Sequence, residues 1–138
     1  MKRLALLAFL LPLAAGCGRF ANETQSAPQA ERIIVIGQQY NEIIWDLGAE
    51  KDIVGVDFSS TYPPAVKKVQ TVGYHRALSA EGILSLKPTL IIHDGSMGPP
   101  QVLQQIQSLK IPTRTFTARN DSIEGTKALV REIGAYFH

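Results

Sequence analysis

Short apolar runs, rich in β-branched residues, alternate along this chain with segments whose apolar residues recur at helical spacing. Buried strands are predicted at Ile33–Ile36, Ile53–Val56 and Leu90–Ile92, with a further strand at 113–116. Helices are predicted at 41–47, 79–86, 101–109 and 122–137. Strands that alternate with helices of about ten residues form parallel sheets. The pattern therefore predicts an α/β fold, a Rossmann-like parallel sheet flanked by helices.

Local signals predict where these elements end. Gly48 follows the first helix, where a glycine readily takes the left-handed conformation that terminates a helix. Ser79 is suited to cap the second helix, and Pro88 ends it because proline restricts the residue before it. Tyr62-Pro63-Pro64 interrupts the chain after the second strand, and an extended segment resumes at Thr71-Val72.

The length and charge of the chain exclude several classes of protein. With 138 residues there is room for one domain with a core, and 45% hydrophobic with 19% charged residues is an ordinary globular composition. Fourteen basic side chains, less Lys2 and Arg3 in the leader described next, leave 12 against 12 acidic ones. A neutral domain without a basic stripe gives no support for nucleic-acid binding.

The N-terminus has the pattern of an export signal. A positively charged start, twelve apolar residues and a small-residue site predict a signal peptide over residues 1–17. Cys17 stands where bacterial lipoprotein signals place the acylated cysteine, although Leu13 lies four residues before it instead of three. The prediction is a periplasmic or otherwise exported protein, anchored to a membrane through Cys17; an ordinary cleavage site with an incidental Cys17 is the alternative. Residues 18–31 are polar and read as a flexible tether.

One short segment brings chemistry-bearing side chains together. Tyr74, His75 and Arg76 are consecutive and precede the helix expected at Ser79. In an extended segment Tyr74 and Arg76 project to one side and His75 to the other. A phenolate beside a cation is a hard ligand suited to ferric iron, and tyrosine is a known axial ligand of haem. A packing tyrosine whose hydroxyl bonds a backbone group is the alternative.

Enzyme motifs are missing from the sequence. His93-Asp94-Gly95-Ser96 brings together an imidazole, a carboxylate and a hydroxyl, but a catalytic triad is assembled by the fold and not by adjacent residues. There is no Gly-x-Ser-x-Gly motif, no glycine-rich phosphate-binding motif and no zinc-ligand spacing. The sequence therefore gives no support for an enzyme.

A set of motifs spread over residues 32–138 resembles the periplasmic haem-binding proteins of bacterial haem ABC importers. These proteins belong to the wider class of substrate-binding proteins that carry siderophores, haem or cobalamin. The motifs are Arg32–Gly37, Asn41–Ile44, Leu47–Ala49, Ile53–Asp57, Ser60–Pro63, Val72–Tyr74 with Arg76, Leu78–Leu84, Lys87–Leu90, Gly98–Pro100 and Ile111-Pro112. Gly-Tyr-x-Arg followed by Leu-Ser-Ala-Glu-Gly is the combination that indicates haem within the class.

The resemblance implies a two-lobed protein with its ligand between the lobes. Residues 32–138 would be the N-terminal lobe, ending within the helix that joins the two lobes. Tyr74 would be the axial ligand of ferric haem, and Arg76 would stabilise the phenolate or pair with a haem propionate. The turns at 38–40, 59–62 and 94–98 would form this lobe's part of the cleft, and its apolar walls would include Tyr40, Tyr62 and Met97.

The function implied is to bind haem in the periplasm and deliver it to the permease of an ABC importer. The runner-up is a cobalamin-binding or ferric-siderophore-binding protein of the same class. A truncated lobe that folds but binds nothing is the third hypothesis.

Overall fold

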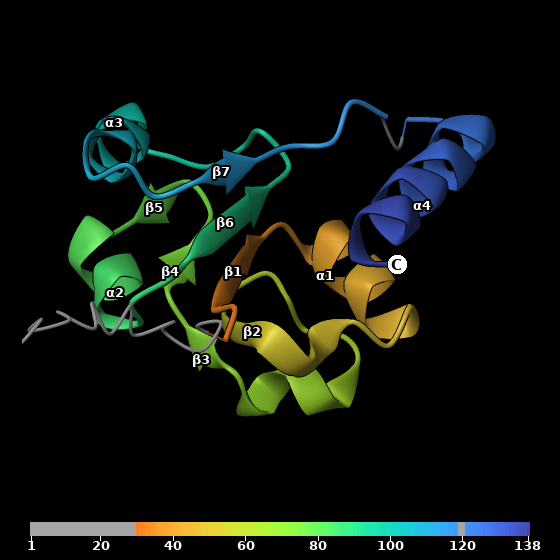
Figure 1. Cartoon of the computed structure of the whole chain (residues 1–138), viewed down its shortest axis with the longest axis horizontal. Coiled ribbons are helices and arrows are strands. Elements are labelled where there is room, and N and C mark those ends of the chain that lie inside the picture. Colours follow the sequence, from red (N-terminus) through yellow and green to blue (C-terminus); the bar gives the residue numbers. More distant parts are fainter. Residues whose placement is uncertain (1–29, 119–120) are drawn as a thin grey trace, which may run out of the picture.

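The computed structural model describes residues 30–118 and 121–138, and strands alternate with helices along them (Figure 1). The strands are β1 (Ile33–Ile36), β2 (Ile53–Val56), β3 (Gln70–Thr71), β4 (Gly73–Tyr74), β5 (Ala77–Leu78), β6 (Leu90–His93) and β7 (Thr113–Arg114). The α-helices are α1 (Gln38–Asp46), α2 (Ala80–Ser85), α3 (Pro100–Ser108) and α4 (Ile123–Phe137). Two short 3-10 helices, η1 (Glu50–Asp52) and η2 (Pro64–Lys68), lie between them.

The main sheet has five strands in the order β3-β2-β1-β6-β7, and all neighbours are parallel. β4 and β5 form a separate antiparallel hairpin. The prediction of a Rossmann-like α/β fold with a parallel sheet flanked by helices is confirmed. β1 lies at the centre, and its whole length pairs with β6, from Ile33 opposite Leu90 to Ile36 opposite His93.

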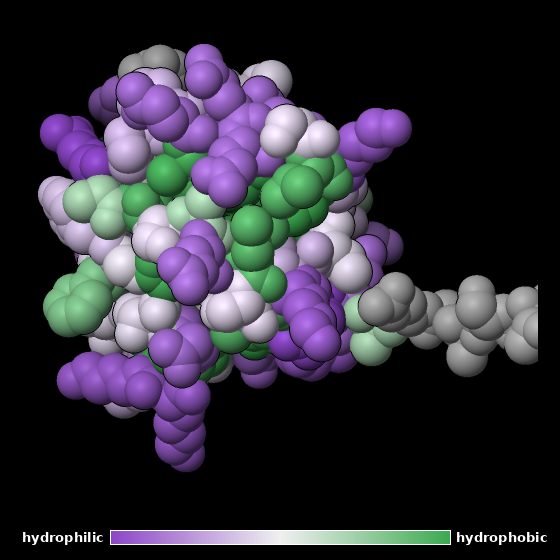
Figure 2. Space-filling view, turned by 90° about the vertical axis from the view of Figure 1, so that its left-hand side faces the viewer, coloured by the Kyte–Doolittle hydropathy of each residue, from purple (hydrophilic) through white to green (hydrophobic). Residues whose placement is uncertain are grey.

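Each face of the sheet carries its own core. Ile33 and Val35 of β1 pack with residues of α1 and α4, whereas Ile34 and Ile36 pack with residues of α2 and α3. Successive strand residues point to opposite faces, so a central strand covered on both faces is apolar throughout. Figure 1 shows α1 and α4 on one side of the sheet and α2 and α3 on the other. On the α2 and α3 side, apolar side chains emerge among hydrophilic ones (Figure 2).

The predicted C-terminal ends of the helices agree with the structure to within one residue, and the short elements were missed. The predicted start of the first helix at 41 was wrong, because α1 already includes residues 38–40, which had been expected as a turn. Gly48 follows α1 with a φ of 70°. The hydroxyl of Ser79 accepts a hydrogen bond from the Gly82 amide at 3.2 Å, as expected for a cap. β7 ends at Arg114, so the prediction of a strand over 113–116 was too long. The hairpin and both 3-10 helices had not been predicted.

The predicted signal peptide at 1–17, the tether at 18–31 and the lipidation site at Cys17 lie outside the described residues, apart from the last two tether positions. Among the helices of residues 30–118 and 121–138, none has the length and apolar character needed to cross a membrane.

The carboxylate of Asp57 is fully buried and fixes the loops that follow β1 and β2. Its oxygens accept hydrogen bonds from the Gly37 amide at 3.0 Å, the Ser59 amide at 3.0 Å, the Ser59 hydroxyl, and the Ser60 hydroxyl at 2.9 Å. Burial alone would raise the pKa of Asp57, but these hydrogen bonds to the charged form outweigh it, and the pKa is lowered. The charged form is therefore the one that the fold stabilises.

We predict that this carboxylate makes stability depend on pH. The pKa of Asp57 is lower in the folded chain than its unfolded value of about 3.9, so its contribution is present above that pH and is lost as the pH falls through the folded pKa. Asp57→Asn should lower the free energy of unfolding at pH 7 by about 1–3 kcal/mol. Urea denaturation from pH 7 to pH 3 should show this gap narrowing. A constant gap would contradict the prediction, and the exposed Asp46→Asn should behave like the parent chain.

A second prediction concerns the core on the α2 and α3 side. Ile91 of β6 has no exposed surface, so Ile91→Ala should leave a cavity in this core. The free energy of unfolding, measured by urea denaturation, should fall by about 2–5 kcal/mol. Leu109→Ala, which shortens a half-exposed side chain after α3, should change stability by less than about 0.5 kcal/mol. Equal changes in the free energy of unfolding for the two substitutions would contradict the prediction.

Candidate functional site

The carboxyl ends of the parallel strands meet at one edge of the sheet, called here the carboxyl edge. Gly37 follows β1, Asp57 follows β2 and Asp94 follows β6. From β1 the chain proceeds to β2 on one side, and β6 lies on the other, so the strand order reverses between β1 and β6. In open α/β sheets, ligands bind at such a reversal outside the carboxyl ends of the strands.

The loops after β1 and β6 approach closely at this reversal. A Cβ atom at Gly37 would lie 3.0 Å from Oδ2 of Asp94, and the φ of Gly37 is 127°. Glycine meets both requirements, because it has no Cβ and tolerates positive φ. A larger residue at position 37 would adopt a strained φ and would press against the side chain of Asp94.

The β4–β5 hairpin is fixed to this edge by backbone hydrogen bonds. The Phe58 amide, after β2, donates to the Gly73 carbonyl at 2.8 Å. The Gly98 amide, after β6, donates to the His75 carbonyl at 2.8 Å, and the Leu78 amide donates to the Gly98 carbonyl at 3.0 Å. The hairpin therefore joins the loops that follow β2 and β6.

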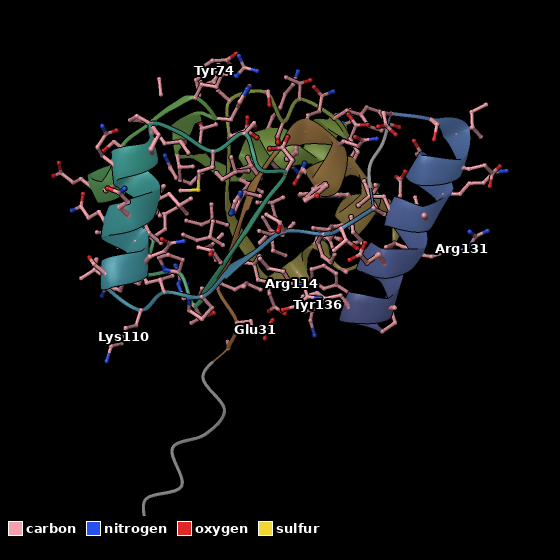
Figure 3. All side chains as sticks on the ribbon, turned by 90° about the horizontal axis from the view of Figure 1, so that it is seen from above. Glu31, Tyr74, Lys110, Arg114, Arg131 and Tyr136 are labelled. Atoms are coloured by element: carbon pink, nitrogen blue, oxygen red, sulfur yellow. The ribbon has the colours of Figure 1, made fainter. Side chains whose placement is uncertain are left out.

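Tyr74 lies on this hairpin with 49% of its surface exposed. Figure 3 shows it at the end of the molecule opposite Glu31, which precedes β1. His75 and Arg76 form the turn between β4 and β5, so the expectation of an extended segment through these residues was wrong. Arg76 is exposed on the same turn, which places a phenol and a guanidinium two residues apart on the surface.

His75 connects the hairpin to the buried carboxylate. Its ring centroid lies 4.2 Å from that of Tyr74, and its Nδ1 lies 3.6 Å from Oδ2 of Asp57. This nitrogen is buried and has no hydrogen-bond partner among the described residues. The Nδ1 of His75 therefore faces the interior of the edge, while about half of the Tyr74 surface is exposed.

The three predicted wall residues are not together. Tyr62 is exposed in the loop before η2. Tyr40 is buried on α1 and packs edge-to-face against Phe116, with ring centroids 5.5 Å apart. Burial raises the pKa of the Tyr40 hydroxyl, which suits a core residue. Met97 is buried in the core on the α2 and α3 side. Of the predicted ligand-contacting residues, Tyr74, Arg76 and Tyr62 are the exposed ones.

Sequence reasoning missed Phe58, the residue directly after the buried Asp57. Its side chain is 70% exposed. A concavity of about 210 Å³ lies beside it, lined by Val56, Phe58, Ser60, Thr61, Val66, Lys67, Val69 and Thr71. The sequence itself indicated this position, because a large apolar residue that follows a buried strand of a parallel sheet lies at the carboxyl edge.

Other features of the described chain do not form a second site. His93 is buried at the end of β6, where its Nδ1 accepts a hydrogen bond from the Gly95 amide at 3.2 Å and burial lowers its pKa. No three His, Cys, Asp or Glu residues within 30–118 and 121–138 are grouped to hold a metal ion. A larger concavity, about 590 Å³, is lined by Glu31, Lys51 and Tyr136 among others, away from the carboxyl edge.

Comparison with known proteins identifies the family. The sequence profile described as "Periplasmic binding protein" matches residues 33–138, more than half of the chain. The vitamin B12-binding protein of Yersinia pestis (strain Pestoides F) is 34% identical over 104 residues, which are 75% of this chain and 37% of that protein.

Solved structures agree with the sequence relatives on the fold. A periplasmic heme-binding protein from Pseudomonas aeruginosa matches with a TM-score of 0.69 and 36% identity, over 77% of this chain and 38% of its own. The periplasmic heme-binding protein RhuT from Roseiflexus sp. RS-1 matches with a TM-score of 0.64 and 40% identity, over 78% of this chain and 44% of its own.

The chain spans less than half the length of these relatives, and that coverage fits one lobe of a larger binding protein. The relatives are named as binding proteins, which confirms the expectation of a binding role without turnover. From the profile match and the shared fold, we conclude that this chain belongs to the periplasmic binding protein family.

Proposed function

We propose that this chain binds ferric haem at the carboxyl edge, with Tyr74 as the iron ligand. The observation that carries the proposal is the half-exposed phenol of Tyr74 on a hairpin fixed to the point where the strand order reverses. A tyrosine phenolate is an established axial ligand of haem iron. The similar solved structures named as heme-binding proteins, at 36% and 40% identity, support haem as the ligand.

Arg76 has one of two roles in this proposal. A guanidinium on the same turn favours the phenolate form of Tyr74 electrostatically, or it pairs with a propionate of the haem. Tyr62, exposed in the loop before η2, is proposed to contact the porphyrin. Tyr40 and Met97 are buried in the two cores, so in this proposal they would pack beneath the carboxyl edge and would not contact the ligand.

The proposal extends to transport. The bound haem would be handed in the periplasm to the inner-membrane permease of an ABC importer, as expected for this family. The leader over residues 1–17, the tether at 18–31 and acylation of Cys17 remain part of this proposal, and would hold the domain near that permease.

The direct test is a titration of the purified chain with ferric haem, followed in the Soret and charge-transfer bands. We expect saturable binding with the spectrum of tyrosinate-ligated high-spin iron. Tyr74→Phe should lose that spectrum and weaken binding at least tenfold, about 1.4 kcal/mol. Tyr136→Phe removes an exposed phenol away from the carboxyl edge and should leave the titration unchanged. An unchanged spectrum in Tyr74→Phe would refute the assigned ligand.

Cobalamin is a second candidate ligand, favoured by the curated relatives named vitamin B12-binding proteins. If cobalamin is the cargo, calorimetry should show saturable binding of cyanocobalamin, and haem should not displace it. If haem is the cargo, the affinities should have the opposite order. A ferric siderophore tested in the same way covers the remaining ligand of the class. Failure of all three ligands in a chain that melts cooperatively would favour a lobe that does not bind alone.

A further inference from the structure

We infer that Phe58, with the concavity beside it, forms an apolar contact for a flat, polycyclic ligand, and so determines which ligands the carboxyl edge accepts. The inference rests on the proposed function, because it concerns the same edge. It adds a contact that does not depend on the iron. It therefore applies to the organic part of the ligand separately from Tyr74.

The first support is that Phe58 is exposed and yet held in place. Single exposed apolar side chains are common and by themselves mean little. Here the backbone on both sides is fixed: the Phe58 amide donates to Gly73 at 2.8 Å, and the neighbours Asp57 and Ser59 are joined by a hydrogen bond of 3.0 Å. An aromatic ring on a fixed backbone can contact a ligand with little further loss of conformational entropy.

The second support is the concavity beside the ring. Its floor contains Val56 and Val66, each only 1% exposed, and its rim includes Thr61 and Lys67. A volume of about 210 Å³ is smaller than typical small-molecule sites of about 300–1,000 Å³, so it suits one edge of a ligand and not the whole. The ammonium of Lys67 at the rim suits a ligand that carries carboxylates.

The third support is the direct link between Phe58 and the proposed iron ligand. The carbonyl that accepts the Phe58 amide belongs to Gly73, the residue before Tyr74. One hydrogen bond therefore joins the backbone of Phe58 to the strand that carries Tyr74. A macrocycle held by its iron at Tyr74 would have an apolar surface available in the adjacent loop.

Metal-free protoporphyrin IX separates the two contacts, because it has the porphyrin plane and carboxylates of haem but no iron. Its fluorescence should report binding to the chain. Phe58→Ala should weaken protoporphyrin and haem binding at least tenfold, and Phe58→Tyr should retain most of the affinity because the ring remains. Tyr74→Phe should weaken haem binding only. Ile123→Ala, which shortens another highly exposed apolar side chain, at the start of α4, should have no effect.

Each outcome separates this inference from the proposed function. If the parent chain does not bind protoporphyrin, or if Phe58→Ala binds it within twofold of the parent, the inference is wrong. The tyrosinate spectrum can still appear in that case, and the proposed function then stands. If Phe58→Ala loses protoporphyrin while Tyr74→Phe leaves haem unchanged, the inference stands and Tyr74 is not the ligand. Unchanged urea midpoints for the Phe58 variants would show that lost binding is not lost folding.

Discussion

The buried carboxylate of Asp57 is the contact on which the geometry of the carboxyl edge depends. A charged group without exposed surface is costly unless hydrogen bonds satisfy it, and here they come from Gly37, Ser59 and Ser60. Gly37 begins the loop into α1, and the two serines belong to the loop after β2. The imidazole of His75, 3.6 Å away, extends the arrangement to the hairpin. Three segments far apart in the sequence are thus arranged around one side chain, and the exposed residues of the edge are positioned by this buried group.

This arrangement divides the edge into a fixed interior and an accessible surface. Asp57 and the ring of His75 face inward, whereas Tyr74, Arg76, Phe58 and Tyr62 are exposed. Both aromatic and cationic groups are available on that surface, a combination suited to a large planar anion. The relatives are named for two different ligands, vitamin B12 and heme. Which ligand this chain prefers depends on whether an iron ligand or an apolar contact contributes most of the binding affinity.

The parts of the structure that the sequence predicted are those with a local cause. The strand runs at 33–36, 53–56 and 90–92 are apolar because both faces are covered, and Gly48 and Ser79 act within one helical turn. Tyr40 was predicted in a cleft turn because the first helix was expected to begin only at residue 41. In the structure α1 begins at Gln38, so Tyr40 lies on the inward face of the helix with Ile43 and Ile44. The hairpin could not be predicted, because its two-residue strands have no periodicity and its position depends on Phe58 and Gly98, which are distant from it in the sequence.

The two outer strands of the sheet have a consequence for association between molecules. β3 consists of Gln70 and Thr71, and β7 of Thr113 and Arg114, so each border offers only two residues of polar character. Long, flat, apolar borders allow another chain to add a strand and begin an aggregate, and very short borders prevent this. The outer strands β3 and β7 separate the apolar strands β1, β2 and β6 from the borders of the sheet. At a border, these apolar strands would be strongly prone to pair with another chain. The two short outer strands therefore limit the addition of a further strand at both borders of the sheet.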